Sequence, residues 1–191
     1  VVDDGSQDGT AEIAEAAGAL VLRHMMNRGQ GAALKTGNQA ALTLGAEVIV
    51  HIDADGQHDA SYIAALVSAI EQGQADVVFG SRFLGVPPEG MPWSRRWLIR
   101  GIHVFNTYVL GIPATVSDPQ SGLRAMNAAA AKGILFSQDG MAHCSEILRL
   151  ATKSWRWQEV PVKVRYTKDS LAKGQNGMNS MAASAKIIWK L

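Results

Sequence analysis

The chain has 191 residues, of which 47% are hydrophobic, and its 18 Lys and Arg residues balance 17 Asp and Glu residues. This length and composition fit one globular domain over residues 1–191, and the balanced charge gives no reason to expect a nucleic-acid partner. The single cysteine, Cys144, excludes an intramolecular disulfide and fits a reducing, cytoplasmic compartment. No apolar run approaches the length of a membrane span.

The first residues are typical of the end of a strand that runs into acidic residues. Val1 and Val2 precede Asp3 and Asp4, and a glycine-rich turn then leads to a helix predicted over residues 11–17. Carboxylates at a strand end can accept hydrogen bonds from a ribose or a base N–H, although a plain turn and helix cap explains the same pattern. Because the strand is already under way at Val1, we expect that an N-terminal strand–helix unit of the domain is missing.

A second strand, predicted over residues 19–23, leads to a glycine-rich segment that opens the next helix. Gly29 and Gly31 precede a helix expected over residues 32–44, which carries Lys35 one turn inside. Backbone N–H groups at such a helix start favour a phosphate, so Gly31 is a candidate for phosphate binding. The P-loop and dinucleotide-binding patterns are both incomplete here, and close packing of the loop on the sheet is the alternative.

The next predicted strand leads to the centre of the expected site. A β-branched apolar run at residues 46–50 predicts a buried parallel strand, and Asp53 and Asp55 follow it. Ligands of open α/β sheets bind beyond the carboxyl ends of strands, and two neighbouring carboxylates there favour Mg²⁺ or Mn²⁺. An EF-hand is excluded, because Gly56 and Ala64 stand at the wrong loop positions. Two solvated aspartates that cap a helix are the alternative.

A helix predicted over residues 62–71 and a strand predicted over residues 76–80 continue the alternation, with Arg82 shortly after the strand. Repeated strand–helix–strand order predicts a doubly wound α/β domain, in which a mostly parallel sheet carries helices on both faces. We find no internal repeat in the chain.

The character of the sequence changes after a proline-rich loop at residues 87–92. A helix predicted over residues 93–110 interleaves basic and aromatic residues, namely Trp93, Arg95, Arg96, Trp97, Arg100, Phe105 and Tyr108. This combination suits an anionic membrane surface or a lipid headgroup, so residues 93–110 form a candidate interfacial helix. An ordinary amphipathic helix, with arginine stems lying along the surface, is the alternative.

The remaining chain carries shorter elements. A polar, turn-rich stretch at residues 117–124 leads into a short strand. Two helices follow, at residues 128–135 and 143–152. An edge strand at residues 157–164, a long loop at 167–180 and a last helix at 181–191 complete the chain. The edge position of the strand is indicated by Pro161, which cannot donate to a ladder. Cys144 follows His143, but adjacent residues on a helix point apart, so we expect no catalytic thiol there.

Five stretches resemble, in this order, the inverting GT-A glycosyltransferases of family 2, and most of all the dolichyl- and polyprenyl-phosphate sugar synthases. They are VVDDGSQDGT at 1–10, NRGQGAAL at 27–34, DADGQ at 53–57, GSRF at 80–83 and DPQSGLR at 118–124. No single stretch decides the matter, but together they cover most of the chain. The resemblance implies a GT-A fold, a UDP- or GDP-sugar donor and a polyprenyl phosphate acceptor reached peripherally at a membrane surface.

The resemblance also implies roles for individual residues on the donor side. Asp3 and Asp4 would hold the nucleoside. The metal ion, Mg²⁺ or Mn²⁺, and the donor diphosphate would be held by Asp53, Asp55 and Gln57. The cation would then neutralise the charge that develops on the leaving nucleoside diphosphate.

On the acceptor side, the resemblance places Arg82 and Arg124 near phosphates, and Arg95 or Arg96 near the acceptor phosphate. The acceptor attacks from the face opposite the leaving group and inverts the anomeric carbon. A lipid phosphate is already ionised and needs no strong base, whereas a hydroxyl acceptor needs a carboxylate to take its proton. Asp118 is the candidate for that base.

Two other functions fit the same residues. A nucleotidyltransferase also combines an α/β sheet with a carboxylate-bound metal, but it would release pyrophosphate rather than a nucleoside diphosphate. A non-catalytic domain that binds a sugar nucleotide or a lipid needs the same pocket without turnover. The sequence leaves open the sugar, the base and whether the chain forms a homo-oligomer.

Overall fold

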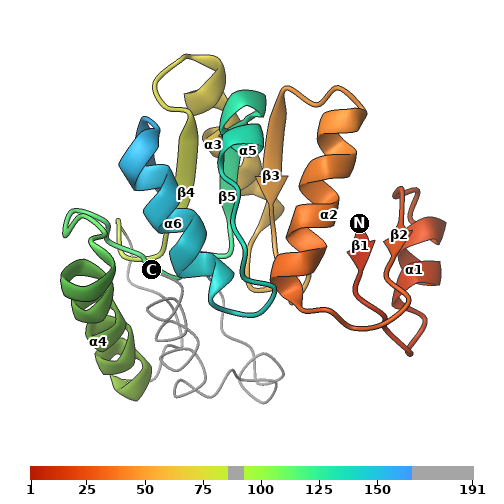
Figure 1. The fold of residues 1–191 in the computed structure, drawn as a ribbon, viewed down its shortest axis with the longest axis horizontal. Helices are drawn as coiled ribbons and strands as arrows, with labels where there is room; N and C mark the ends of the chain where they lie inside the picture. Colours follow the sequence, from red (N-terminus) through yellow and green to blue (C-terminus); the bar gives the residue numbers. More distant parts are fainter. Residues whose placement is uncertain (86–92, 165–191) are drawn as a thin grey trace.

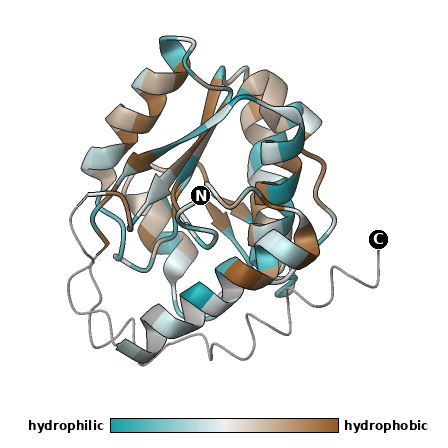
Figure 2. Ribbon diagram, turned by 90° about the vertical axis from the view of Figure 1, so that its left-hand side faces the viewer, coloured by the Kyte–Doolittle hydropathy of each residue, from teal (hydrophilic) through white to brown (hydrophobic). Residues whose placement is uncertain are grey.

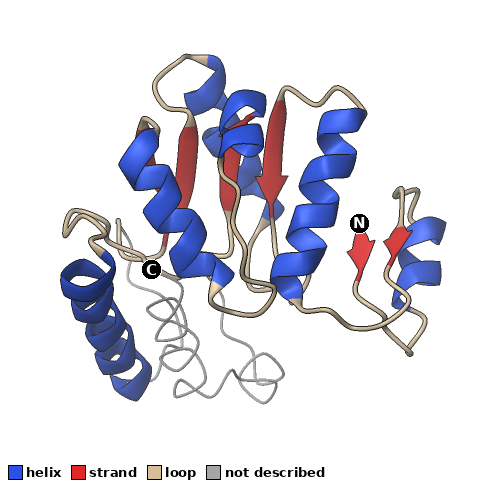
Figure 3. Cartoon of the chain, in the orientation of Figure 1, coloured by secondary structure: helices blue, strands red, loops and turns tan. Residues whose placement is uncertain are grey.

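The computed structural model of the protein describes residues 1–85 and 93–164. Helices and strands alternate along most of this chain, as the sequence predicts (Figure 1, Figure 3). In order, the elements are β1 (Val2–Asp3), α1 (Thr10–Ala16), β2 (Leu22–Arg23), α2 (Gln30–Thr43), β3 (Val48–His51), a 3-10 turn (Ala60–Tyr62), α3 (Ile63–Glu71), β4 (Val77–Ser81), α4 (Trp93–Leu110), β5 (Arg124–Asn127), α5 (Ala128–Gly133), α6 (His143–Ser154) and β6 (Trp157–Pro161).

The main sheet has the strand order β3–β5–β4–β6, and β1 and β2 form a separate parallel pair. β4 and β6 are parallel, whereas β5 runs antiparallel to both β3 and β4. β3, β4 and β6 therefore share one direction, in keeping with the α/β fold expected from the sequence. The reversal of β5 was not anticipated, because its direction depends on the long connection before it and not on a local pattern.

Helices cover both faces of the main sheet (Figure 1). On one face, Ile49 and Phe79 pack in an apolar cluster with Ile147 of α6, and α2 and α5 complete this cover. On the other face, Val78 packs with Leu66 of α3. All residues of β4 are buried, which explains why this strand appears in the sequence as a continuous apolar run.

Most of the expected elements are confirmed. The helix predicted over residues 93–110 is α4, and β6 lies at the edge of the sheet, as Pro161 indicates. The strand expected over residues 19–23 is shorter, because β2 pairs with β1 only at Leu22–Arg23. The loop predicted over 167–180 and the helix predicted over 181–191 lie outside the described residues.

The site is positioned by the ends of strands and helices. β3 and β4 carry their carboxyl ends to one edge of the sheet, and α2 begins near that edge (Figure 1). α2 contacts both β1 and β3 and so connects the two sheets. The segments that follow β3 and β4 therefore lie close to the segment that precedes β5.

Candidate functional site

Asp53 lies two residues beyond β3 and is partly enclosed by its neighbours. The side chain of Gln30, the first residue of α2, donates a hydrogen bond to Asp53 Oδ1 at 2.6 Å. Burial raises the pKa of Asp53, the positive charge of Arg124 opposes this rise, and the negative charge of Asp55 adds to it. A divalent cation beside this carboxylate would favour its ionised form, because an opposite charge within a few ångströms offsets the cost of burial.

The segment 117–122 lies directly against Asp53. Gly122 approaches the carboxylate so closely that a Cβ atom at position 122 would collide with Asp53 Oδ2. This Cβ atom would also lie 3.4 Å from His58 Nε2. Burial lowers the pKa of His58, and its Nδ1 atom has no hydrogen-bond partner in the described part of the chain. The sequence analysis did not single out His58, because its neighbourhood is formed by residues distant along the chain.

Asp55 is exposed, and its Oδ1 atom accepts a hydrogen bond from the Gln57 N–H group at 3.0 Å. Within residues 1–85 and 93–164, no group of three or more His, Cys, Asp or Glu side chains is arranged to hold a metal ion. Mg²⁺ commonly takes one or two protein carboxylates and completes its coordination with water and substrate phosphates. The exposed Asp55 and the neighbouring Asp53 fit a cation of this kind, whose other positions water and a diphosphate would fill.

Arg82 and Asp118 form a buried ion pair. Arg82 Nε lies 2.6 Å from Asp118 Oδ2, and the two side chains are 7% and 1% exposed. The Arg82 N–H group also donates to Oδ2, and the Gln120 N–H group donates to Oδ1 at 3.3 Å. Arg82 Nη2 in turn donates to the Gln120 carbonyl at 2.7 Å. Both carboxylate oxygens of Asp118 are therefore engaged, and the pair fixes the end of β4 to the segment before β5.

Glu159 of β6 holds the same segment from another side. Its two carboxylate oxygens accept hydrogen bonds from the N–H groups of Ser117 at 2.8 Å and Asp118 at 2.9 Å. Ser117 Oγ also lies 2.5 Å from Ser81 Oγ at the end of β4. The sequence analysis missed Glu159, because its position depends on the pairing of β6 with β4, which no local pattern encodes.

Arg124, the first residue of β5, is 2% exposed and lies in register with His51 of β3 and Phe79 of β4. Burial, with the charge of Arg124 as the next cause, lowers the pKa of His51 to about 3. Arg124 Nη2 lies 3.8 Å from Cys144 Sγ. Arg124 is thus a buried cation that acts on Asp53 through its charge, and its expected contact with a phosphate stays a prediction.

The structure corrects the expectation that His143 and Cys144 point apart. His143 Nδ1 lies 2.8 Å from the Gly140 carbonyl, which can only accept a hydrogen bond. The neutral ring therefore carries its proton on Nδ1, and Nε2 can accept. Nε2 lies 3.3 Å from Cys144 Sγ. His143 is the first residue of α6, and its hydrogen bond to the Gly140 carbonyl, three residues earlier, holds the ring where Nε2 faces Cys144 Sγ.

Asp3 and Asp4 organise the loops around β1. Asp4 accepts hydrogen bonds from the N–H groups of Arg28 at 3.0 Å and Gly29 at 2.7 Å. Asp3 is 3% exposed and accepts from the Ser6 N–H group at 3.0 Å. These bonds occupy part of the accepting capacity of both carboxylates. Their expected contact with a nucleoside stays a prediction.

The glycine-rich segment at the start of α2 packs against residues 137–140, and the expected phosphate contact of Gly31 stays a prediction. The Gly31 N–H group donates to the Asp139 carbonyl at 2.7 Å. A Cβ atom at Gly31 would collide with the Gln138 carbonyl. Lys35 adds an ion pair with Asp139. Close packing thus explains Gly31, although the partner is this loop and not the sheet.

Hydrophobic and hydrophilic residues alternate along α4 (Figure 2). Its exposed positions include Trp93, Trp97, Arg100, Val104 and Tyr108, which recur at spacings of three or four residues. Arg100 Cζ lies 5.5 Å from the centre of the Trp97 ring. The side chains of Arg95 and Arg96 lie outside those that the structure describes. Among the described helices, none has the length and hydropathy needed to cross a membrane.

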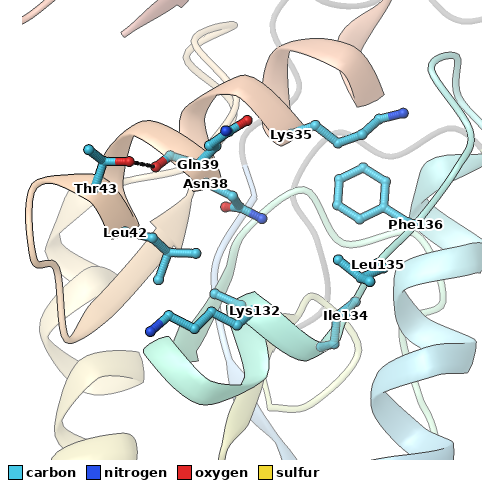
Figure 4. Close-up of a pocket in the computed structure, with 10 residues that line it drawn as sticks. Lys35, Asn38, Gln39, Leu42, Thr43, Lys132, Ile134, Leu135 and Phe136 are labelled. Atoms are coloured by element: carbon cyan, nitrogen blue, oxygen red, sulfur yellow. Dashed lines mark hydrogen bonds between the residues drawn. The ribbon is translucent and has the colours of Figure 1, made fainter.

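A groove of about 520 Å³ lies between α2 and α5 (Figure 4). It is lined by Lys35, Asn38, Gln39, Leu42, Thr43, Ala131, Lys132, Ile134, Leu135 and Phe136. None of the predicted site residues belongs to this lining. Its Asn38 side chain lies 2.6 Å from Nε2 of His51, the residue in register with Arg124. Asp53 and Asp55 do not line the groove.

Known proteins resemble this chain both in sequence and in fold. Residues 1–132 match the model of glycosyl transferase family 2. The UDP-N-acetylglucosamine–dolichyl-phosphate N-acetylglucosaminyltransferase of Methanococcus voltae is 34% identical over 93% of the chain and 78% of that relative. The polyprenol monophosphomannose synthase of Mycolicibacterium smegmatis is 32% identical over 98% of the chain and 73% of that relative.

A solved structure also resembles this chain in fold. The glucosyl-3-phosphoglycerate synthase structure from Mycobacterium tuberculosis superimposes with a TM-score of 0.67 at 19% identity, over 96% of the chain and 66% of that structure. This similarity shows a shared fold of the GT-A type. Together with the family match, it confirms the resemblance seen in the sequence, and the chain belongs to glycosyl transferase family 2.

Proposed function

We propose that this chain transfers a sugar from a nucleotide-sugar donor to a polyprenyl phosphate and inverts the anomeric carbon. Membership of family 2 supports glycosyl transfer. The relatives from M. voltae and M. smegmatis, which are named for dolichyl-phosphate and polyprenol substrates, support the lipid acceptor. The M. tuberculosis synthase has been solved with Mn²⁺ and UDP-glucose, which supports a UDP- or GDP-linked donor and a divalent cation.

The hydrogen bonds of Asp118 are the observation that favours a phosphate acceptor over a hydroxyl acceptor. A hydroxyl acceptor needs a carboxylate that removes its proton, whereas a lipid phosphate attacks in its ionised form. Asp118, the candidate base, uses both oxygens to bind Arg82 and the Gln120 N–H group. A carboxylate held in this way is suited to orienting Arg82 toward phosphate groups and not to proton removal.

Asp53 and Asp55 are the proposed ligands of the cation, and Gln57 is the proposed contact of the donor diphosphate. When bound, the cation neutralises charge on the leaving nucleoside diphosphate. Gln30 fixes the orientation of Asp53 through its hydrogen bond to Oδ1. Arg124 supports the ionised form of Asp53, which burial alone would disfavour.

The exposed side of α4 is the proposed contact with the membrane that carries the acceptor. An anionic surface attracts Arg100, and the rings of Trp97 and Tyr108 can lie at the lipid interface. Each basic residue near such a surface contributes about 1 kcal/mol. We therefore propose weak, reversible and peripheral binding, on the cytoplasmic side of the membrane.

Asp55→Asn tests the proposed cation site. We expect the Mn²⁺-dependent part of UDP or GDP binding, measured by calorimetry, to fall at least tenfold, because the exposed carboxylate is lost. Asp59→Asn is the matched control, since it removes a carboxylate from the same loop but keeps an oxygen for the Ser61 N–H group. Equal Mn²⁺-dependent binding by Asp55→Asn and the parent would refute the role of Asp55.

Turnover tests the reaction itself. The parent chain is incubated with UDP- and GDP-sugars, Mn²⁺ and a short polyprenyl phosphate, and the products are identified by mass spectrometry. We expect a glycosylated lipid phosphate and a nucleoside diphosphate. In a parallel incubation with a nucleoside triphosphate and a sugar 1-phosphate, release of pyrophosphate would instead indicate a nucleotidyltransferase. Binding without any product in either incubation would indicate a non-catalytic domain.

A further inference from the structure

Arg124 is a buried cation whose hydrogen bonding is incomplete. Its residue is 2% exposed, and its Nε atom has no hydrogen-bond partner among residues 1–85 and 93–164. The guanidinium instead directs Nη2 at Cys144 Sγ, 3.8 Å away. A buried charge is costly unless an opposite charge lies beside it. Asp53 supplies one such charge, and a thiolate at Cys144 would supply a second.

His143 provides a place for the thiol proton. Its Nε2 atom lies 3.3 Å from Cys144 Sγ and is the accepting nitrogen, because Nδ1 donates to the Gly140 carbonyl. Transfer of the proton to Nε2 would leave a thiolate between an imidazolium and a guanidinium. Burial raises the pKa of the Cys144 thiol, but the charges and hydrogen bonds of His143 and Arg124 outweigh burial and lower the pKa to about 7.

The groups that face the thiol come from two elements. His143 belongs to α6 with Cys144 itself, and Arg124 belongs to β5. His51 of β3 lies in register with Arg124, and its pKa of about 3 keeps it neutral, so it adds no charge near neutral pH. Cys144 is only partly buried, so a small reagent can reach it.

We propose that Cys144 is a modification site for hydrogen peroxide and small thiol-reactive electrophiles. With peroxide, the thiolate sulfur attacks one oxygen, an S–O bond forms and the O–O bond breaks. Sulfur loses two electrons to give a sulfenic acid, and the departing hydroxide takes the proton from His143 to form water. The chain has no second cysteine, so a small external thiol would be the reductant that restores Cys144.

The pH dependence of alkylation tests the reactivity of the thiol. Because the chain has one cysteine, every iodoacetamide adduct seen by intact mass reports on Cys144. We expect a rate midpoint near pH 7 for the folded chain, and near pH 8.5, the ordinary thiol value, for the chain unfolded in urea. The same midpoint in both states, or no reaction of the folded chain, would overturn the proposal.

His143→Asn tests the source of the reactivity. The Asn amide keeps an N–H donor for the Gly140 carbonyl but removes the nitrogen that faces Cys144. We expect the midpoint to rise by about one pH unit or more toward the ordinary thiol value. His103→Asn is the control, because His103 on α4 bonds to the Val116 carbonyl and should leave the midpoint unchanged.

Peroxide treatment tests the oxidation directly. We expect the peroxide-treated parent to gain one adduct of dimedone, a reagent for sulfenic acids, by intact mass, and treated Cys144→Ser to gain none. Both proteins share the exposed Met25 and Met26, so methionine oxidation affects them alike. A treated parent without the adduct would overturn the proposal.

Discussion

Because Gly122 has no side chain, two parts of the proposed donor site can approach each other closely. Gly122 has no Cβ atom, so the segment 117–122 lies against the Asp53 carboxylate. The same segment is held by the Arg82–Asp118 ion pair and by Glu159. These interactions hold Gly122 against the Asp53 carboxylate, which we propose as a metal ligand. A larger residue at position 122 would therefore first displace Asp53.

Gly122→Ala should therefore impair the site. The new Cβ atom collides with Asp53 Oδ2, so the carboxylate or the segment must move. We expect Mn²⁺-dependent UDP or GDP binding to weaken at least tenfold, and the free energy of unfolding to fall by about 1–3 kcal/mol. Gly101→Ala on α4 is the control, because no neighbouring atom lies within 4 Å of its new Cβ. Calorimetry and urea unfolding measure both, and parent-like binding by Gly122→Ala would contradict the prediction.

At the scale of single residues, the sequence predicted where acidic residues would lie, but not which residues would form hydrogen bonds with them. The positions of Asp53 and Asp55 follow from a strand and a turn, which are local patterns. The hydrogen bonds of Asp118 and Glu159 join residues 36 and 41 positions apart, and no local pattern encodes them. Gly31 is ambiguous from the sequence, because glycine permits close packing and phosphate binding equally well.

At the scale of the elements, Asp76 joins the turn before β4 to the end of β5 and to the start of β6. Its carboxylate accepts hydrogen bonds from Arg156 Nη2 at 2.9 Å and Nε at 3.1 Å, next to the start of β6. It also accepts from Asn127 Nδ2 at 3.0 Å, at the end of β5. The hydrogen bond from Arg156 is the largest cause that lowers the pKa of Asp76.

The stability that Asp76 contributes should depend on pH. Because its folded pKa is lowered, the contribution is present above the unfolded value of about 3.9 and is lost as the pH falls through the folded value. Asp76→Asn should lower the free energy of unfolding by about 1 kcal/mol at pH 7, since solvent around Arg156 screens the pair. Urea unfolding at several pH values measures this difference, with exposed Glu71→Gln as the control. A difference that stays constant down to pH 3 would argue against the ion pair.

The order of the elements could be read from the sequence better than their pairing. The continuous apolar run that became β4 predicts a strand buried on both faces, and Pro161 predicts the edge position of β6. The antiparallel placement of β5 between β3 and β4 could not be read in the same way. It is determined by the path of residues 82–123, and local periodicity gives no information about such a path.

Across the whole molecule, α4 contacts the segment that adjoins the proposed donor site. α4 lies beside the edge to which β3 and β4 carry their carboxyl ends (Figure 1). His103 of α4 lies 2.7 Å from the Val116 carbonyl through Nε2, directly before the segment that contains Asp118. In the proposed function, a lipid phosphate approaches over α4 toward the segment 117–122.

The double variant Trp97→Ser, Arg100→Glu tests this approach. We expect co-sedimentation with anionic phosphatidylserine vesicles to fall at least tenfold, because a charge is reversed and an exposed ring is lost. Mn²⁺-dependent nucleotide binding should be unchanged, since neither residue is a proposed donor contact. Lys153→Glu, at an exposed position on α6, is the control for charge alone. If the double variant sediments like the parent, α4 is an ordinary surface helix.

The central place of β5 in the sheet also imposes an order of assembly during synthesis. β3 and β4 both pair with β5, whose residues 124–127 leave the ribosome well after residues 77–81 of β4. At roughly 5–20 residues per second, the two earlier strands wait for seconds without their common partner. Unpaired strand edges invite pairing with other chains. The rate at which residues 82–123 are translated therefore sets how long the nascent chain is open to association with its neighbours.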